Sequence, residues 1–318
     1  MFAAPIFMHI PDGFLSVPVA ILFWFVTVIV VGYALKRAGA DLGERQVPMM
    51  GVLAAAIFAG QMLNFAVAGG TSGHLIGAAL ATILLGPWAS ILVLTCVVAI
   101  QALIFQDGGL LVLGANIFNM GIIGVTVSYM AYRSVQKLAG GRTWGIFTGG
   151  FAAAWLSVEV AALATALELA LSGTSPANIA IPAMGGIHAL IGIGEGLITA
   201  GALAFLYASR RDLLKVGDTA PGRGGLVWVA GLAFALLLAV ASPLASTHPD
   251  GLMWVARQKG FLDIEQNPFY KIIPHYVFPG VSNKTLATIL AGILGTLIVF
   301  GVAFAVARLR RRKTTSDQ

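Results

Sequence analysis

Long apolar runs decide what this chain can fold into, because about 20 consecutive apolar residues span a bilayer as a helix. Only 10% of the 318 residues are charged, far fewer than in soluble domains, and the mean hydropathy is +0.90. The sequence therefore predicts an all-α polytopic membrane protein and excludes a soluble enzyme or a nucleic-acid-binding domain. The runs lie at 18–36, 50–67, 75–86, 88–106, 110–133, 145–172, 183–208, 226–246 and 286–307.

The run at 75–86 is short, so it could be a half-span or a full crossing. Nine crossings with the N-terminus outside place 15 of the 19 Lys and Arg residues in or beside the inside loops and the C-terminal tail. Lys and Arg gather on the cytoplasmic side of membrane proteins, and eight crossings would break this pattern. We therefore predict nine spans with the C-terminus inside. The net charge of +6 then reflects orientation and requires no nucleic-acid partner.

A polar, Gly-rich linker at 212–225 divides the chain into a seven-span unit at 8–211 and a two-span unit at 226–318. Residues 1–7 precede the first unit as a short extension. The last two spans are joined by a long outside loop at 247–283, which we expect to be partly ordered.

Two histidines on the outside face are candidate metal ligands. The single cysteine, Cys96, excludes a cysteine-cluster site. If Met8 were the first residue of the mature chain, its amine, the backbone nitrogen of His9 and the His9 imidazole could hold one metal in two fused chelate rings. His74, in the Gly-rich segment 69–74, could supply a fourth nitrogen and complete a square plane, which Ni(II) or Cu(II) favours. Alternatively, each histidine simply bonds to nearby backbone.

Ionisable residues inside the spans are costly and therefore need a reason. Glu159, Glu168 and Glu195 are such carboxylates, and we expect Glu168 to reach water near the outer end of its span. His188 and Glu195 lie seven residues apart on one helix face. Either Glu159, His188 and Glu195 form a buried hydrogen-bonded network between helices, or they relay protons. No nucleotide-binding lysine motif is present, so the chain is not expected to hydrolyse ATP.

Several motifs resemble those of one transporter family. The segment Met8-His-Ile-Pro-Asp-Gly-Phe-Leu-Ser16 resembles the N-terminal signature of the CbiM/NikM family, the substrate-capture components of energy-coupling-factor transporters for cobalt and nickel. The likeness covers about residues 8–210 and includes the segments around His74, 114–121 and 186–199. The region from His248 onward resembles the two-span PDGLE-type accessory unit, NikN in nickel systems, with Met253 in place of that motif's glutamate.

The resemblance implies capture of Ni(II) or Co(II) by Met8, His9 and His74. Because the amine of Met8 must be free, it also implies that the chain starts at Met8 or that residues 1–7 are removed. Behind these ligands we expect Asp12 to be an acceptor that orients His9, with Asn64 as a further candidate. A membrane T component and two cytoplasmic ATPase subunits are the implied partners, in the plasma membrane, and no resident cofactor is implied. The alternative is a proton-coupled secondary transporter that uses Glu159 and Glu195.

Overall fold

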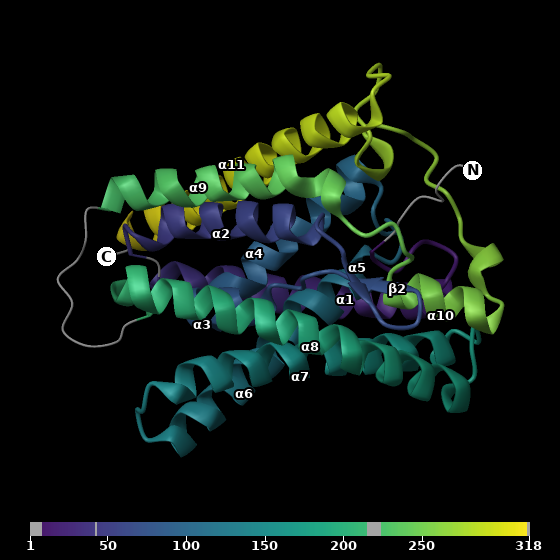
Figure 1. Cartoon of the computed structure of the whole chain (residues 1–318), viewed down its shortest axis with the longest axis horizontal. Coiled ribbons are helices and arrows are strands. Elements are labelled where there is room, and N and C mark those ends of the chain that lie inside the picture. Colours follow the sequence, from purple (N-terminus) through teal and green to yellow (C-terminus); the bar gives the residue numbers. More distant parts are fainter. Residues whose placement is uncertain (1–7, 42, 215–223, 317–318) are drawn as a thin grey trace.

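The computed structural model describes residues 8–41, 43–214 and 224–316, and these are mostly helical (Figure 1). A single two-stranded hairpin, β1 (Phe65–Val67) and β2 (Thr71–Gly73), interrupts the helices. Two π-helical segments, Gln101–Phe105 and Phe118–Ile123, extend α4 and join α5 to α6. The helices are α1 (Val17–Asp41), α2 (Gln46–Gln61), α3 (Ala78–Leu85), α4 (Pro87–Ile100), α5 (Leu113–Ile117), α6 (Gly124–Ala139), α7 (Trp144–Leu171), α8 (Ala177–Ser209), α9 (Gly224–Ala241), α10 (Gly251–Lys259) and α11 (Lys284–Ser316).

The prediction of an all-α polytopic membrane protein is confirmed. Seven helical segments of the described residues are long and apolar enough to cross a membrane. The two other predicted spans are shorter, because α2 has 16 residues and α3 only 8. Ala38, Gln46 and Gly86 line one small cavity, so the turn after α3 lies at the same end of the molecule as the connection from α1 to α2. This path agrees with nine passes, but the number of crossings and the orientation stay predictions.

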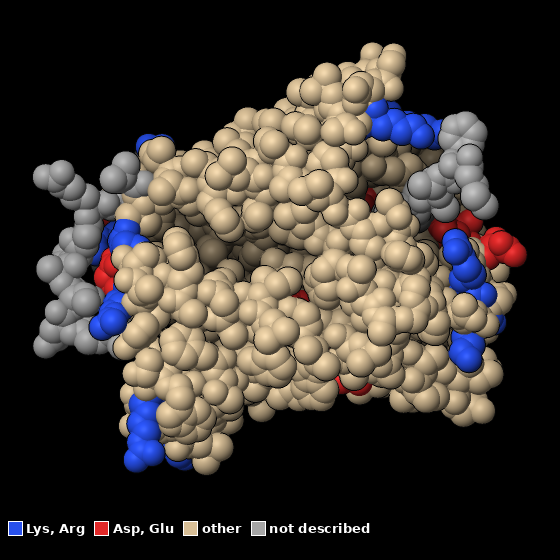
Figure 2. Space-filling view, in the orientation of Figure 1, with Lys and Arg blue, Asp and Glu red and all other residues tan. Residues whose placement is uncertain are grey.

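On the face shown in Figure 2, the Lys and Arg side chains lie towards the two ends of the long axis. A broad band of other residues lies between them on this face. At one end the last turns of α11 meet the first connection of the chain, where Arg311 contacts Glu44 at 2.6 Å and Arg310 donates to the Leu35 carbonyl at 2.8 Å. This arrangement is typical of a helical bundle whose apolar belt faces lipid.

The two-span helices α9 and α11 pack against α2 of the first unit (Figure 1). Small residues allow this close approach. A Cβ on Gly51 would lie 3.0 Å from the Phe300 ring, and one on Gly231 would lie 2.6 Å from Val52. Most of the predicted linker, residues 215–223, lies outside the described residues.

The end of the molecule opposite the C-terminus carries the parts that form a candidate site. The N-terminal segment from Met8, the β1–β2 hairpin, the loop 106–112 and the long loop between α9 and α11 meet there. Gly69 and Gly70 form the hairpin turn, with φ of 85° and 78°, a conformation that glycine adopts without steric cost. The hairpin places β2, and therefore His74 directly after it, next to the N-terminal segment.

Candidate metal centre

Met8, His9 and His74, the three residues predicted to hold a metal, line one cavity of about 70 Å³. The ring centroids of His9 and His74 lie 5.6 Å apart, although 64 residues separate them in the chain. His9 is buried, and neither of its ring nitrogens makes a hydrogen bond of good geometry among the described residues. A buried ring nitrogen without a partner is costly, and a metal ion is one group that would satisfy it.

The backbone of the N-terminal segment is held rigidly beside α5. The side chain of Asn116 pairs with both backbone groups of Ile10, accepting from its N–H and donating to its carbonyl, each at 3.0 Å. Gly109 also donates to the Ile10 carbonyl at 2.9 Å. At Gly108, whose φ is 94°, a Cβ would lie only 2.9 Å from the Cβ of His9. The loop 106–112 therefore fits closely around His9 and fixes where its ring can point.

Asp107 is the carboxylate that faces His9. One of its oxygens, Oδ1, accepts from the backbone nitrogen of Met8 at 2.8 Å and lies 3.1 Å from Nδ1 of His9. The other accepts from the Tyr276 hydroxyl at 2.6 Å. Burial would raise the pKa of Asp107, but the charge and contact of His9 and the hydrogen bonds from Tyr276 and Met8 lower it below its usual value. Asp107 is thus held as a buried carboxylate between two nitrogens that the sequence predicts to be metal ligands.

The structure does not give Asp12 the role expected for it. Its carboxylate accepts from the backbone N–H groups of Leu110, Leu111 and Val112 at 2.9 to 3.2 Å. These groups belong to the turn directly before α5, so Asp12 holds that turn and makes no hydrogen bond to His9. Sequence proximity favoured Asp12, but the acceptor beside His9 comes from a loop 98 positions away.

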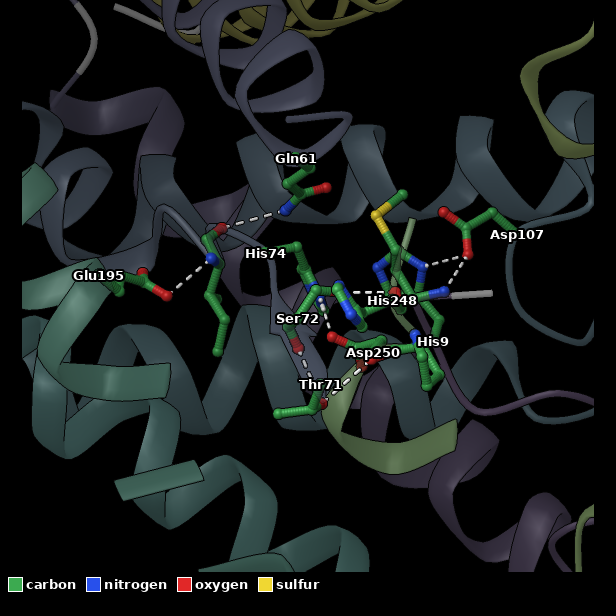
Figure 3. Close-up of polar contacts among 12 residues, drawn as sticks. His9, Gln61, Thr71, Ser72, His74, Asp107, Glu195, His248 and Asp250 are labelled. Atoms are coloured by element: carbon green, nitrogen blue, oxygen red, sulfur yellow. Dashed lines mark hydrogen bonds and ion pairs between the residues drawn. The ribbon is translucent and has the colours of Figure 1, made fainter. Parts of the chain in front are cut away.

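His74 is held by the long loop of the two-span unit. Its Nδ1 lies 3.1 Å from Oδ1 of Asp250, and both side chains are largely buried (Figure 3). Burial alone would lower the pKa of His74, but the Asp250 carboxylate, with weaker contributions from Asp107 and Glu195, raises it above its usual value. The fourth predicted metal ligand therefore comes from one unit and its acceptor from the other.

The membrane-embedded polar residues have separate partners. Glu195 accepts from the backbone N–H groups of Ile76 and Gly77 at 2.8 and 2.9 Å, which fixes the connection between His74 and α3. His188 lines the cavity, and its Nδ1 contacts the Met184 carbonyl at 2.8 Å. No hydrogen bond joins Glu159 to Glu195 or His188 in the described part of the chain. These contacts agree with a helix-holding role for Glu195 and do not assemble a proton relay.

Two other predicted positions differ from expectation. Glu168 was expected to reach water, but it is buried and accepts from Asn119 at 2.9 Å. Asn64 is also buried, yet it does not line the cavity, and its backbone carbonyl accepts from Ser246 at 2.7 Å. Neither residue contacts the two histidines.

Asp107 and Asp250 are the residues that reasoning from the sequence missed. A signal for Asp107 was present, because the predicted topology places the loop 106–112 outside, beside the N-terminus. A signal for Asp250 was its place in Pro249-Asp250-Gly251, which repeats Pro11-Asp12-Gly13. The sequence alone did not show which carboxylate faces which histidine.

Residues 9–213 match the model of the CbiM family, described as the cobalt uptake substrate-specific transmembrane region. The chain belongs to this family. Residues 225–312 match the PDGLE domain. The chain is 38% identical over 308 residues to a putative fused nickel transport protein NikMN of Archaeoglobus fulgidus, covering 96% of this chain and 99% of the relative.

Two further likenesses point the same way. The fused nickel transport protein NikMN of Rhodobacter capsulatus is 33% identical over 250 residues, covering 73% of this chain and 71% of the relative. A crystal structure of a truncated transition metal transporter superposes with a TM-score of 0.56 at 38% identity, covering 63% of this chain and 99% of that chain. The resemblance to the CbiM/NikM family and the PDGLE-type unit is therefore confirmed.

Proposed function

We propose that this protein is the substrate-capture component of an ATP-driven energy-coupling-factor transporter that imports Ni(II) or Co(II) through the plasma membrane. The relatives carry names of nickel transport proteins, and the family is described by cobalt uptake. A membrane T component and two cytoplasmic ATPase subunits would be its partners, since the chain has no nucleotide-binding lysine motif of its own. The chain itself would be a transporter component and not an enzyme.

The close approach of His9 and His74 in one cavity, with the backbone nitrogen of Met8 beside them, carries this proposal. Among the described residues, no three His, Cys, Asp or Glu side chains form a metal-binding group. The proposed site draws on backbone nitrogens as well as on the two histidines. The Met8 amine, the deprotonated backbone nitrogen of His9 and one imidazole nitrogen from each histidine would make four nitrogens, a set that suits square-planar Ni(II).

Asp107 gives this proposal a further step. Its Oδ1 occupies the space between the Met8 nitrogen and Nδ1 of His9, where a metal that bridges these two nitrogens would lie. Metal binding would therefore displace this oxygen. The carboxylate would keep its hydrogen bond from the Tyr276 hydroxyl to Oδ2. The amine of Met8 must be free, so the functional chain would begin at Met8.

Nickel titration of the purified chain beginning at Met8 tests the site. We expect one Ni(II) per chain, at least 100-fold weaker binding in His74→Ala, and loss of tight binding in His9→Ala, which removes an imidazole and alters the chelate. His248→Ala is the matched control, because His248 is exposed and bonds only to Ser246 through its ring. Wild-type affinity in either His9→Ala or His74→Ala, or in a chain that retains residues 1–7, would contradict the proposed ligands.

Uptake into vesicles separates the ATP-driven mechanism from the proton-coupled alternative. We expect accumulation of radioactive nickel only when the T component, both ATPase subunits and ATP are present, and no loss when a protonophore is added. The contacts of Glu195 support this expectation, because both of its oxygens are occupied by backbone N–H groups. Uptake by this chain alone that collapses with the proton gradient would favour the secondary transporter instead.

A further inference from the structure

We propose that Asp250 of the two-span unit is the residue that positions His74 for metal binding. The inference rests on the proposed function, since it concerns the fourth ligand of that site. It assigns to the PDGLE domain a direct part in the metal centre: one carboxylate that fixes the rotation and the protonated nitrogen of a histidine in the other unit.

The backbone around Asp250 is fastened to the hairpin that carries His74. The Ser72 N–H donates to the Pro249 carbonyl at 2.8 Å, and the Ser72 hydroxyl donates to the His248 carbonyl at 2.8 Å. The Thr71 hydroxyl adds a bond to Pro249 at 3.0 Å. Both hydroxyl-bearing residues come directly before Gly73 and His74, so the loop and the histidine are held in one frame (Figure 3).

Asp250 occupies the N-cap of α10, yet its side chain does not cap that helix. Aspartate at this position usually accepts from a backbone N–H in the first turn and so stabilises the helix. Here the carboxylate turns to Nδ1 of His74 at 3.1 Å instead, and Asp250 is only 3% exposed. A buried carboxylate needs a donor, and His74 is the side-chain donor that the structure provides.

This contact has a chemical consequence for His74. A carboxylate accepts only, so the proton of a neutral ring resides on Nδ1 and the lone pair is left on Nε2. Histidines that bind metals commonly give their other N–H to such an acceptor, which fixes the ring and makes it a stronger ligand. Asp250 therefore prepares His74 to bind through Nε2, on the side of the ring away from the carboxylate.

Nickel affinity of the full chain beginning at Met8, measured by competition with a chelator, tests the inference. We expect Asp250→Asn to weaken binding by about 10- to 100-fold, the usual effect of losing such a partner, and Asp250→Glu to recover most of the loss. Asp263→Asn is the matched control, because Asp263 is an exposed carboxylate of the same loop. It should leave the affinity unchanged.

A double-mutant cycle separates positioning from general damage to the fold. If Asp250 acts through His74, Asp250→Asn should change the weak residual affinity of His74→Ala by less than twofold. An equal loss in both backgrounds, or wild-type affinity in Asp250→Asn, would overturn the inference while the nickel site itself remains. If the parent chain binds no nickel, or if His74→Ala binds as well as the parent, the proposed function fails and this inference fails with it.

Discussion

The tripeptide Pro-Asp-Gly occurs twice in this chain, at 11–13 and at 249–251, and the aspartates of the two copies bind different kinds of donor. Each is preceded closely by a histidine and followed by a buried apolar residue, Phe14 or Leu252. In the first copy, Asp12 accepts from three backbone N–H groups and builds the frame around α5. In the second, Asp250 accepts from His74. The same local sequence therefore supports the fold in one place and the candidate site in the other.

The neighbouring residues explain the difference. Gly13 has φ of 95°, and a Cβ there would lie 2.1 Å from the carbonyl oxygen of Ile264, so the first copy is a tight turn pressed against the long loop. Gly251 is instead the first residue of helix α10, and the three atoms nearest to a Cβ there would be side-chain atoms of His188 and Ile191, at 2.7 to 2.9 Å. The tripeptide at 11–13 therefore packs against the Ile264 backbone, whereas Asp250 of the tripeptide at 249–251 lines the cavity.

The two glycines give the largest expected contrast in stability. We expect Gly13→Ala to lower the free energy of unfolding by about 3 kcal/mol or more, because the left-handed backbone is strained with a side chain and the Ile264 backbone must move. Gly251→Ala should cost less than about 1 kcal/mol, since alanine favours the helix and the contacted side chains can shift. Unfolding by denaturant in mixed micelles measures both. Equal losses would show that the two turns are under the same constraint.

Much of the fold could be predicted from the sequence, because apolar runs of sufficient length have few alternatives to membrane helices. The segment from 50 to 86 was harder, since its polar hairpin and the short helix α3 divide a region that hydropathy alone treats as two spans. Helix α8 begins at Ala177, before the predicted start at 183, and it contains Pro182. Membrane helices tolerate such prolines when neighbouring helices pack around them.

That the three candidate ligands lie close together could be predicted, but the carboxylates beside the histidines could not. Met8, His9 and His74 line one cavity as expected, because the predicted topology placed them on the same side. Asp107 and Asp250 reach the histidines across 98 and 176 positions of sequence. Contacts at that separation depend on how α5, the hairpin and the two-span unit pack together. The local sequence around each residue does not predict them.

The two aspartates give the sharpest test of the comparison. Asp12→Ala leaves three backbone N–H groups before α5 without their acceptor, so we expect a loss of about 2 kcal/mol in the free energy of unfolding. Asp250→Ala removes an acceptor from a side chain and should lower the stability of the metal-free protein by less, while it weakens nickel binding more. Denaturant unfolding of the metal-free chain and nickel titration of the folded chain measure the two quantities separately.

The effects of the two substitutions on nickel binding should be opposite to their effects on stability. Asp12→Ala that remains folded should bind nickel within a few-fold of the parent, because the Asp12 carboxylate bonds to the backbone of Leu110, Leu111 and Val112 and not to either histidine. If Asp12→Ala loses nickel affinity in proportion to its loss of stability, the frame around α5 and the site behave as one unit, since Ile10 and Gly109 share the same loop contacts. If Asp250→Ala is instead the less stable of the two, its bond to His74 serves mainly to fasten the two-span loop to the hairpin, and the two copies have the same role.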